Sequence, residues 1–207
     1  MMNQPAIKLP TQNFTGFDNP ELQILPVEFE GQIDLRLDPE DHAARDALHA
    51  AILIPLPGPC QFIQNQQRRL DWLGPDFFRL HLPIIECDSC LQTLAQLPSH
   101  LQIHAVEVSD YYACQLMIAG PSARDLLATA IPLDLAKASF ASGTIKGTRM
   151  ANATIWLACL DDDDDCPHFT LSVRWSFADY VIDYLGCAAQ EFMPNQHIQT
   201  ASIQSSL

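Results

Sequence analysis

The sequence lacks the loops that usually hold the phosphates of nucleotide cofactors. No G-x-G-x-x-G follows a predicted strand, and G-x-x-x-x-G-K-[ST] is absent from the 207 residues. The G-x-S-x-G nucleophile elbow is missing as well, because Gly120-Pro121-Ser122-Ala123-Arg124 departs from that pattern. These absences predict that the chain alone holds neither FAD nor NAD, and they leave no motif that names a reaction.

Charged residues are scarce, and basic residues are outnumbered. Asp, Glu, Lys and Arg make up 17% of the sequence, against about 25% in a typical domain. The 11 Lys and Arg residues stand against 25 Asp and Glu residues, which gives a formal net charge of −14. This negative field repels phosphate backbones and anionic lipid surfaces, so we expect neither nucleic acid nor membrane as a partner. Few charges also leave apolar surface for a partner chain to cover.

The cysteines do not form the pattern of a disulfide framework or a metal site. There are 7 of them, scattered along the chain, and residues 1–10 contain no apolar segment typical of a secretory signal. Cys87-Asp88-Ser89-Cys90 has no second cysteine pair to complete a zinc site, so we interpret it as incidental thiols at a helix start. We therefore expect a reduced, cytoplasmic protein without a bound metal.

Long apolar runs and calcium loops are also missing. No stretch approaches the roughly 18 apolar residues of a membrane-spanning helix. Residues 161–165 are consecutive aspartates, but they lack the spacing, the glycine and the distal glutamate of a calcium-binding loop. A block of like charges is typical of a solvated hairpin tip, and we interpret the run in that way.

The periodicity of apolar residues predicts alternating strands and helices in residues 21–108. The expected order is strand, helix, three strands, helix, strand, with strands at 32–37, 60–65, 69–73, 77–82 and 101–108. The first helix is expected after Asp38-Pro39-Glu40-Asp41, with a buried stripe, and the second at 87–97. The stripe of the first helix is predicted to consist of Ala43, Ala47, Leu48 and Ala51.

Residues 109–192 repeat this order in part. Strands are expected at 113–119, once or twice within 148–160, and at 169–173. One helix starts after Gly120-Pro121-Ser122, and Ser176 is expected to cap another that carries Phe177, Tyr180, Val181 and Tyr184 on its packed face. We predict an α+β fold of two ferredoxin-like halves, about 21–108 and 109–192, with mostly antiparallel sheets. A flexible arm at 1–20 and a loose tail at 193–207 flank the halves. The core should include Leu126, Leu127, Trp156 and Val181.

Four residues are candidates for a surface that meets a partner. Arginine suits paired contacts with carboxylates, and tryptophan adds apolar area with one polar N–H. Arg174 and Trp175 straddle a strand end and a helix start, so they should point in opposite directions, with Trp175 inward. The alternatives are core packing and intrachain pairs with Asp125, Asp134 or Asp179. The candidate residues are Arg124, Arg149, Arg174 and Trp175.

Several short segments, in order and spacing, resemble the gamma subunit of heterotetrameric sarcosine oxidase, which is similar in turn to the folate-binding domain of aminomethyltransferases. The resemblance spans residues 25–192 and is strongest after Val106. It rests on G-Q-I-D-L-R at 31–36, W-L-G-P-D at 72–76, V-S-D at 108–110, G-P-S-A-R-D-L-L at 120–127, P-L-D-L at 132–135 and R-W-S-F-A-D-Y at 174–180.

The resemblance implies an accessory, non-catalytic subunit. Its complex would oxidatively demethylate sarcosine to glycine, with formaldehyde or methylene-tetrahydrofolate and hydrogen peroxide as further products. The partners implied are the alpha, beta and delta subunits, which would carry FAD, FMN and NAD. No catalytic residue is transferred to this chain. Two alternatives stay open: a self-standing folate-binding protein or folate-dependent one-carbon transferase, with tetrahydrofolate as ligand, and a structural homologue with an unrelated partner.

Overall fold

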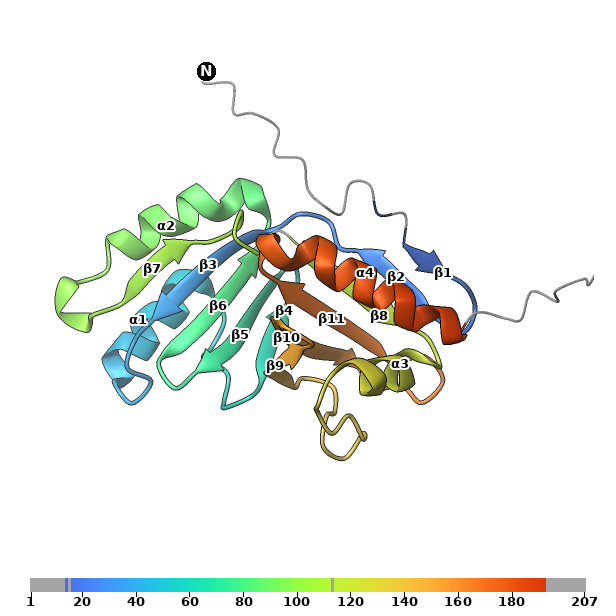
Figure 1. Ribbon diagram of the computed structural model, residues 1–207. Coiled ribbons are helices and arrows are strands. Elements are labelled where there is room, and N and C mark those ends of the chain that lie inside the picture. Colours follow the sequence, from blue (N-terminus) through green and yellow to red (C-terminus); the bar gives the residue numbers. More distant parts are fainter. Residues whose placement is uncertain (1–13, 15, 113, 193–207) are drawn as a thin grey trace, which may run out of the picture.

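Two antiparallel sheets lie side by side, each covered on one face by helices (Figure 1). A computed structural model describes residues 14, 16–112 and 114–192. The fold is mixed α+β, and every strand pair in both sheets is antiparallel, so the predicted fold class is confirmed. The expected tail at 193–207 and most of the expected arm at 1–20 lie outside the described residues.

The first sheet is built from residues 31–107 in the strand order β4-β5-β6-β3-β7. Its elements follow the predicted order, strand, helix, three strands, helix, strand. They are β3 (Gly31–Arg36), α1 (His42–Ile52), β4 (Phe62–Asn65), β5 (Arg68–Gly74), β6 (Phe77–Leu82), α2 (Cys87–Ala95) and β7 (His104–Glu107).

The second sheet has the order β1-β2-β8-β11-β10-β9. The stretch expected to hold one or two strands holds two, and β9 begins before the predicted start. Two strands near the N-terminus, which the periodicity did not indicate, join this sheet. The elements are β1 (Phe17–Asp18), β2 (Gln23–Pro26), β8 (Cys114–Ala119), α3 (Ala123–Ala130), β9 (Ile145–Met150), β10 (Ala153–Asp161), β11 (His168–Val173) and α4 (Ala178–Ala189).

The two sheets repeat one arrangement of strands. In the second sheet, β2 occupies the position that β7 occupies in the first sheet. Read from the edge, β4-β5-β6-β3-β7 corresponds to β9-β10-β11-β8-β2. The hydrogen bonds after the two strands agree as well. Val108, which follows β7, donates its N–H to the carbonyl of Gln32 in β3 (2.8 Å), and Val27, which follows β2, donates its N–H to the carbonyl of Gln115 in β8 (3.0 Å). Thus β7, which follows α2, and β2, from the start of the chain, are equivalent strands.

The helix boundaries follow local signals, but one predicted helix face was wrong in part and one predicted cap was wrong. Asp41 caps α1 by accepting from Ala43 N and Ala44 N. The buried stripe is Ala44, Leu48 and Ile52, so Leu48 is buried as predicted and the three predicted alanines are not part of it. Before α4 the chain makes a 3-10 turn, Trp175–Phe177, and no side chain caps the helix, so Ser176 is not its cap.

Each sheet has its own apolar core on the helix side, and a smaller cluster joins the sheets. Leu126, Leu127 and Val181 are buried in the second core, as predicted, whereas Trp156 is only half-buried. Trp156 belongs to the joining cluster. That cluster consists of Leu73, Ile145 and Ala158, with Phe62, Phe77, Trp156 and Leu160 around them.

Candidate functional site

The most exposed aromatic residues of the described chain lie where the link before β8 meets the turn from β11 into α4. The backbone holds this turn against the link before β8, because Trp175 N donates to the carbonyl of Tyr111 (2.9 Å). Tyr111 is 68% exposed, and Phe177 and Tyr180 are each 39% exposed. The predicted packed face of α4 was therefore wrong at Phe177 and Tyr180, whose aromatic rings face solvent instead.

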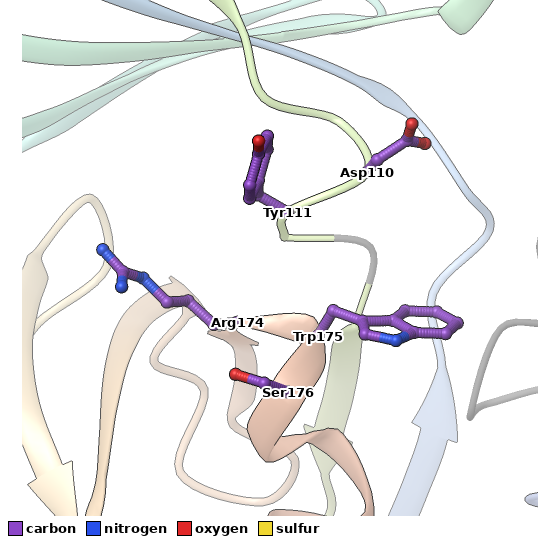
Figure 2. Close-up of a pocket in the computed structure, with 5 residues that line it drawn as sticks. All are labelled: Asp110, Tyr111, Arg174, Trp175 and Ser176. Carbon is purple, nitrogen blue, oxygen red and sulfur yellow. The ribbon is translucent and has the colours of Figure 1, made fainter.

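A hollow of about 470 Å³ lies over this turn. Figure 2 shows the side chains of Arg174 and Trp175 leaving the turn in opposite directions, with Tyr111 above them. Trp175 is half-buried and Arg174 is exposed, and the sequence predicted that Trp175 would be the more inward of the two. The hollow is lined by Asp110, Tyr111, Arg174, Trp175 and Ser176.

A second hollow, of about 370 Å³, shares Arg174 as a wall. It opens where the two sheets meet, since its lining comes from β6, β10 and the turns that follow β9 and β11. Arg149 on β9 is the direct cross-strand neighbour of Thr154, which lines this hollow. The lining is formed by Phe77, Tyr112, Asn152, Thr154, Trp156, Arg174 and Phe177.

Tyr112 links two arginines across this region. Arg174 Nε donates to the Tyr112 hydroxyl at 3.3 Å, and Arg79 Cζ lies 3.6 Å from the centroid of the same ring. Arg79 is itself paired with Asp34, at 2.7 Å. Burial opposes ionisation of the phenol, but hydrogen bonds from Arg174 and Arg79 outweigh it and hold the pKa of Tyr112 below its usual value. The hydrogen bond to Tyr112 also raises the pKa of Arg174.

Arg149 and Arg174 lack a carboxylate partner, although acidic residues predominate in the chain. Half of the Lys and Arg side chains within the described ranges are paired with carboxylates, as in Arg36–Asp76 and Arg68–Glu86. Among these residues, Arg149 and Arg174 form no ion pair, and both are exposed. Two free cations beside an aromatic hollow are suited to carboxylates from another molecule.

Arg124 has a different environment from the other three predicted residues. Its Nη1 donates to the carbonyls of Leu135 (2.5 Å) and Phe140 (3.3 Å), and its Cζ lies 5.1 Å from the ring centroid of Phe169. It lines neither hollow. The guanidinium thus fastens the segment after α3 onto the second core, so the structure brings together Arg174 and Trp175, with Arg149 nearby, and places Arg124 apart.

A buried charged cluster that the sequence did not indicate lies between the sheets, around His81. His81 Nδ1 lies 2.6 Å from Glu30 Oε1, and its Nε2 lies 2.9 Å from Asp71 Oδ2. Arg69 Nε donates to Asp71 (2.8 Å), and Gln115 of the second sheet donates to Glu30 (2.8 Å). The available signal was the i, i+2 spacing of Arg69 with Asp71 in β5 and of Arg79 with His81 in β6, which places polar groups on one sheet face.

The cluster sets the charge of its own members. Burial opposes the charged forms, but the neighbouring charges outweigh it: Arg69 and His81 hold the pKa of Asp71 at about 2, and Asp71 and Glu30 raise the pKa of His81. Both nitrogens of His81 are occupied by carboxylates, so neither is free to accept a proton from a substrate. The arrangement acts as an ionic connection between the sheets, bordering a third hollow of about 260 Å³.

The described residues show neither a metal centre nor an exposed thiol in the C-x-x-C pair. No group of three or more His, Cys, Asp or Glu side chains is placed to hold a metal ion there. Cys87 and Cys90 are buried, and burial raises the pKa of both thiols. At residues 161–165, Asp164 pairs with Lys137 at 3.0 Å. None of the described helices has the length and apolar character needed to cross a membrane.

The family model for the sarcosine oxidase gamma subunit matches residues 36–191. A search of curated proteins finds no similar sequence.

Solved structures that are similar to this chain include two that bear on the fold. The first is heterotetrameric sarcosine oxidase from Corynebacterium sp. U-96 in complex with pyrrole 2-carboxylate, with a TM-score of 0.73, 24% identity and coverage of 87% of this chain and 90% of that chain. The second is the glycine cleavage system aminomethyltransferase T from Bartonella henselae, with a TM-score of 0.51 and 12% identity. There the match covers 81% of this chain and 46% of the other.

Proposed function

Because the chain belongs to the sarcosine oxidase gamma subunit family, we propose that it is an accessory, non-catalytic subunit of a sarcosine-oxidase-like complex. The observation that carries the proposal is the family match over residues 36–191. The complex would demethylate sarcosine oxidatively to glycine, with formaldehyde or methylene-tetrahydrofolate and hydrogen peroxide as the other products. The alpha, beta and delta subunits would be the partners of this chain.

The environments of the titratable groups support placing the chemistry in the other subunits. His81 is occupied on both nitrogens, and burial raises the pKa of Cys114 to about 12 and that of Cys159 to about 11. These are not the surroundings of an activated base or nucleophile. FAD, FMN and NAD would then be bound by the partner subunits. All seven cysteines are free, which favours assembly in the reducing cytoplasm.

The surface that meets a large subunit would be the hollowed aromatic surface around Arg174. Tyr111, Trp175 and Phe177 supply apolar area, and Arg149 and Arg174 supply two cations without intrachain carboxylates. Aromatic residues and arginine carry much of the binding energy in protein interfaces. Carboxylates on the partner would therefore pair with these arginines while apolar side chains fill the hollows. Arg124, which is held by carbonyl oxygens, would contribute through the fold alone.

Assembly with the other subunits tests this function. The chain would be co-expressed with the alpha, beta and delta subunits, one of which carries an affinity tag, and recovery of the chain would be measured. We expect a stable complex, which Arg149→Ala with Arg174→Ala weakens by about tenfold or more. Arg45→Ala is the matched control, because Arg45 is also exposed and lies on α1 of the first half. Failure of the unmodified chain to assemble would overturn the function, and unchanged assembly of the double variant would move the interface elsewhere.

One observation favours a second candidate, a self-standing folate-binding protein. Asp110 lines the hollow over the turn together with Tyr111 and Trp175, so a carboxylate lies beside two aromatic side chains. A pterin needs such a carboxylate and a slot for its ring. Titration of the isolated chain with tetrahydrofolate, followed by tryptophan fluorescence, distinguishes the candidates. Quenching that Asp110→Asn abolishes would favour folate binding. Without saturable quenching, the subunit function would remain as the single candidate.

A further inference from the structure

The two sheets differ at equivalent edges. The strand β2 is covered on its outer side by β1, through the pairs Phe17↔Ile24 and Asp18↔Gln23. Its counterpart β7 is the last strand of the first sheet, and no strand of the described chain pairs with its outer edge. Figure 1 shows β7 at the end of the molecule opposite β1. The repeated arrangement thus leaves room for a sixth strand beside β7.

The register of β7 shows which backbone groups point outward. Val108 N donates to the Gln32 carbonyl, and the register continues through Val106↔Asp34 and His104↔Arg36. In an antiparallel ladder, bonded and non-bonded pairs alternate. Val106 and His104 therefore bond to β3, while the N–H and C=O groups of Ala105 and Glu107 point away from it. These outward groups are the ones that an added strand requires.

The side chains of β7 suit an apolar neighbour. Val106 is 61% exposed, and it lies on the face of β3 that carries Asp34, away from the helices. The strand contains neither proline nor lysine, the residues that commonly protect an edge. Its one carboxylate, on Glu107, accepts a hydrogen bond from the Ser109 hydroxyl at 3.0 Å. An incoming strand would meet a valine and two outward peptide groups.

We propose that β7 accepts an extended segment of another subunit, which pairs with Ala105 and Glu107 and places an apolar side chain against Val106. The proposal rests on the proposed function, because it takes its partner from the complex. The chain does not supply this strand from the segment that precedes β7, since that segment is α2 followed by a 3-10 turn. A second copy is disfavoured by the net charge of −14 on each molecule.

Three variants test the edge within the assembled complex. Ala105→Pro removes an outward N–H that β3 does not use, and Val106→Glu places a charge on the exposed site. Each should weaken assembly about tenfold or more, since ladder bonds or apolar contact are lost. Val106→Ile is the matched control and should assemble as the unmodified chain does. Circular dichroism of each isolated variant verifies that it is folded.

Amide hydrogen exchange gives a readout that does not depend on any variant. The amides of Ala105 and Glu107 should exchange rapidly in the isolated chain and become protected in the complex. If the complex forms with these amides unprotected and Val106→Glu binds normally, the edge proposal is wrong and the subunit function stands. If the unmodified chain does not assemble, both the edge proposal and the subunit function are wrong. A dimer of the isolated chain that Ala105→Pro dissociates would identify a second copy as the occupant and overturn the proposed one.

Discussion

Arg174 and Tyr112 are joined by a hydrogen bond from Nε to the phenol oxygen at 3.3 Å, although the two residues lie on different connecting segments of the chain. Tyr112 belongs to the link that leads from β7 into β8, and Arg174 follows β11. Because Arg79 of β6 lies on the same ring, one tyrosine contacts cations from both sheets. The hollowed aromatic surface around Arg174 therefore lies where the two halves meet.

Tyr112→Phe should remove a phenol whose pKa lies below its usual value. The arginines favour the ionised form of Tyr112, so its pKa lies below the usual value. A titration followed by tyrosinate absorbance should show one of the 4 tyrosines ionising before the others, and this step should vanish in the variant. In Arg174→Ala the step should move to higher pH. An unchanged titration curve for Tyr112→Phe would contradict the assignment.

His81→Gln should reduce the loss of stability at alkaline pH. The pKa of His81 is raised in the folded protein above its ordinary 6.5, so its contribution is complete below pH 6.5. That contribution disappears as the pH rises through the folded pKa. Urea unfolding of the unmodified chain should therefore show a lower free energy of unfolding at pH 9 than at pH 6. The variant should be less stable at pH 6 and should lose less between these two values.

Leu127→Ala should destabilise the second core by about 2–5 kcal/mol. Leu127 of α3 is fully buried in the second core, so truncation leaves a cavity that rigid packing cannot close. Leu53→Ala is the matched control, because Leu53 is 67% exposed and should change stability by no more than about 0.5 kcal/mol. Equal midpoints of urea unfolding for both variants would show that the core assignment is wrong.

Gly31→Ala should destabilise the first half by about 1–3 kcal/mol, because the added methyl group has no room. A Cβ at this position would lie 2.2 Å from the Cys87 Sγ. Cys87→Ala in the same chain should restore part of the loss, which a double-mutant cycle would measure. Gly74→Ala is the control, since its Cβ would meet only Phe77 Cβ at 3.5 Å. No recovery in the double variant would show that the clash lies elsewhere.

The sequence predicted most of the first half because its elements are local and strongly periodic. All seven elements from β3 to β7 appear in the expected order. The strands β1 and β2 were missed, because residues 17–18 and 23–26 are short and their pairing with β8 is fixed by residues far along the chain. Local periodicity carries no information about such a partner.

The candidate site was predictable in part. Arg174 and Trp175 could be placed at a strand end, and the structure puts both beside a hollow. The exposure of Phe177 and Tyr180 was not predictable, because their spacing matches that of a packed helix face. The cluster around His81 was not recognised, because charged residues alternating on a strand are typical of a solvent face. Here the second sheet covers that face, and only tertiary structure reveals it.

The place of β2 has a consequence for biosynthesis. The ribosome makes β2 before any other strand of the second sheet except β1, yet its pairing partner β8 follows only after the whole first sheet. During translation the first sheet can assemble while β2 waits with the buried residues Leu22 and Ile24 uncovered. Closure of the second sheet then draws the start of the chain to its later part, so the second half is complete only after β11 has emerged.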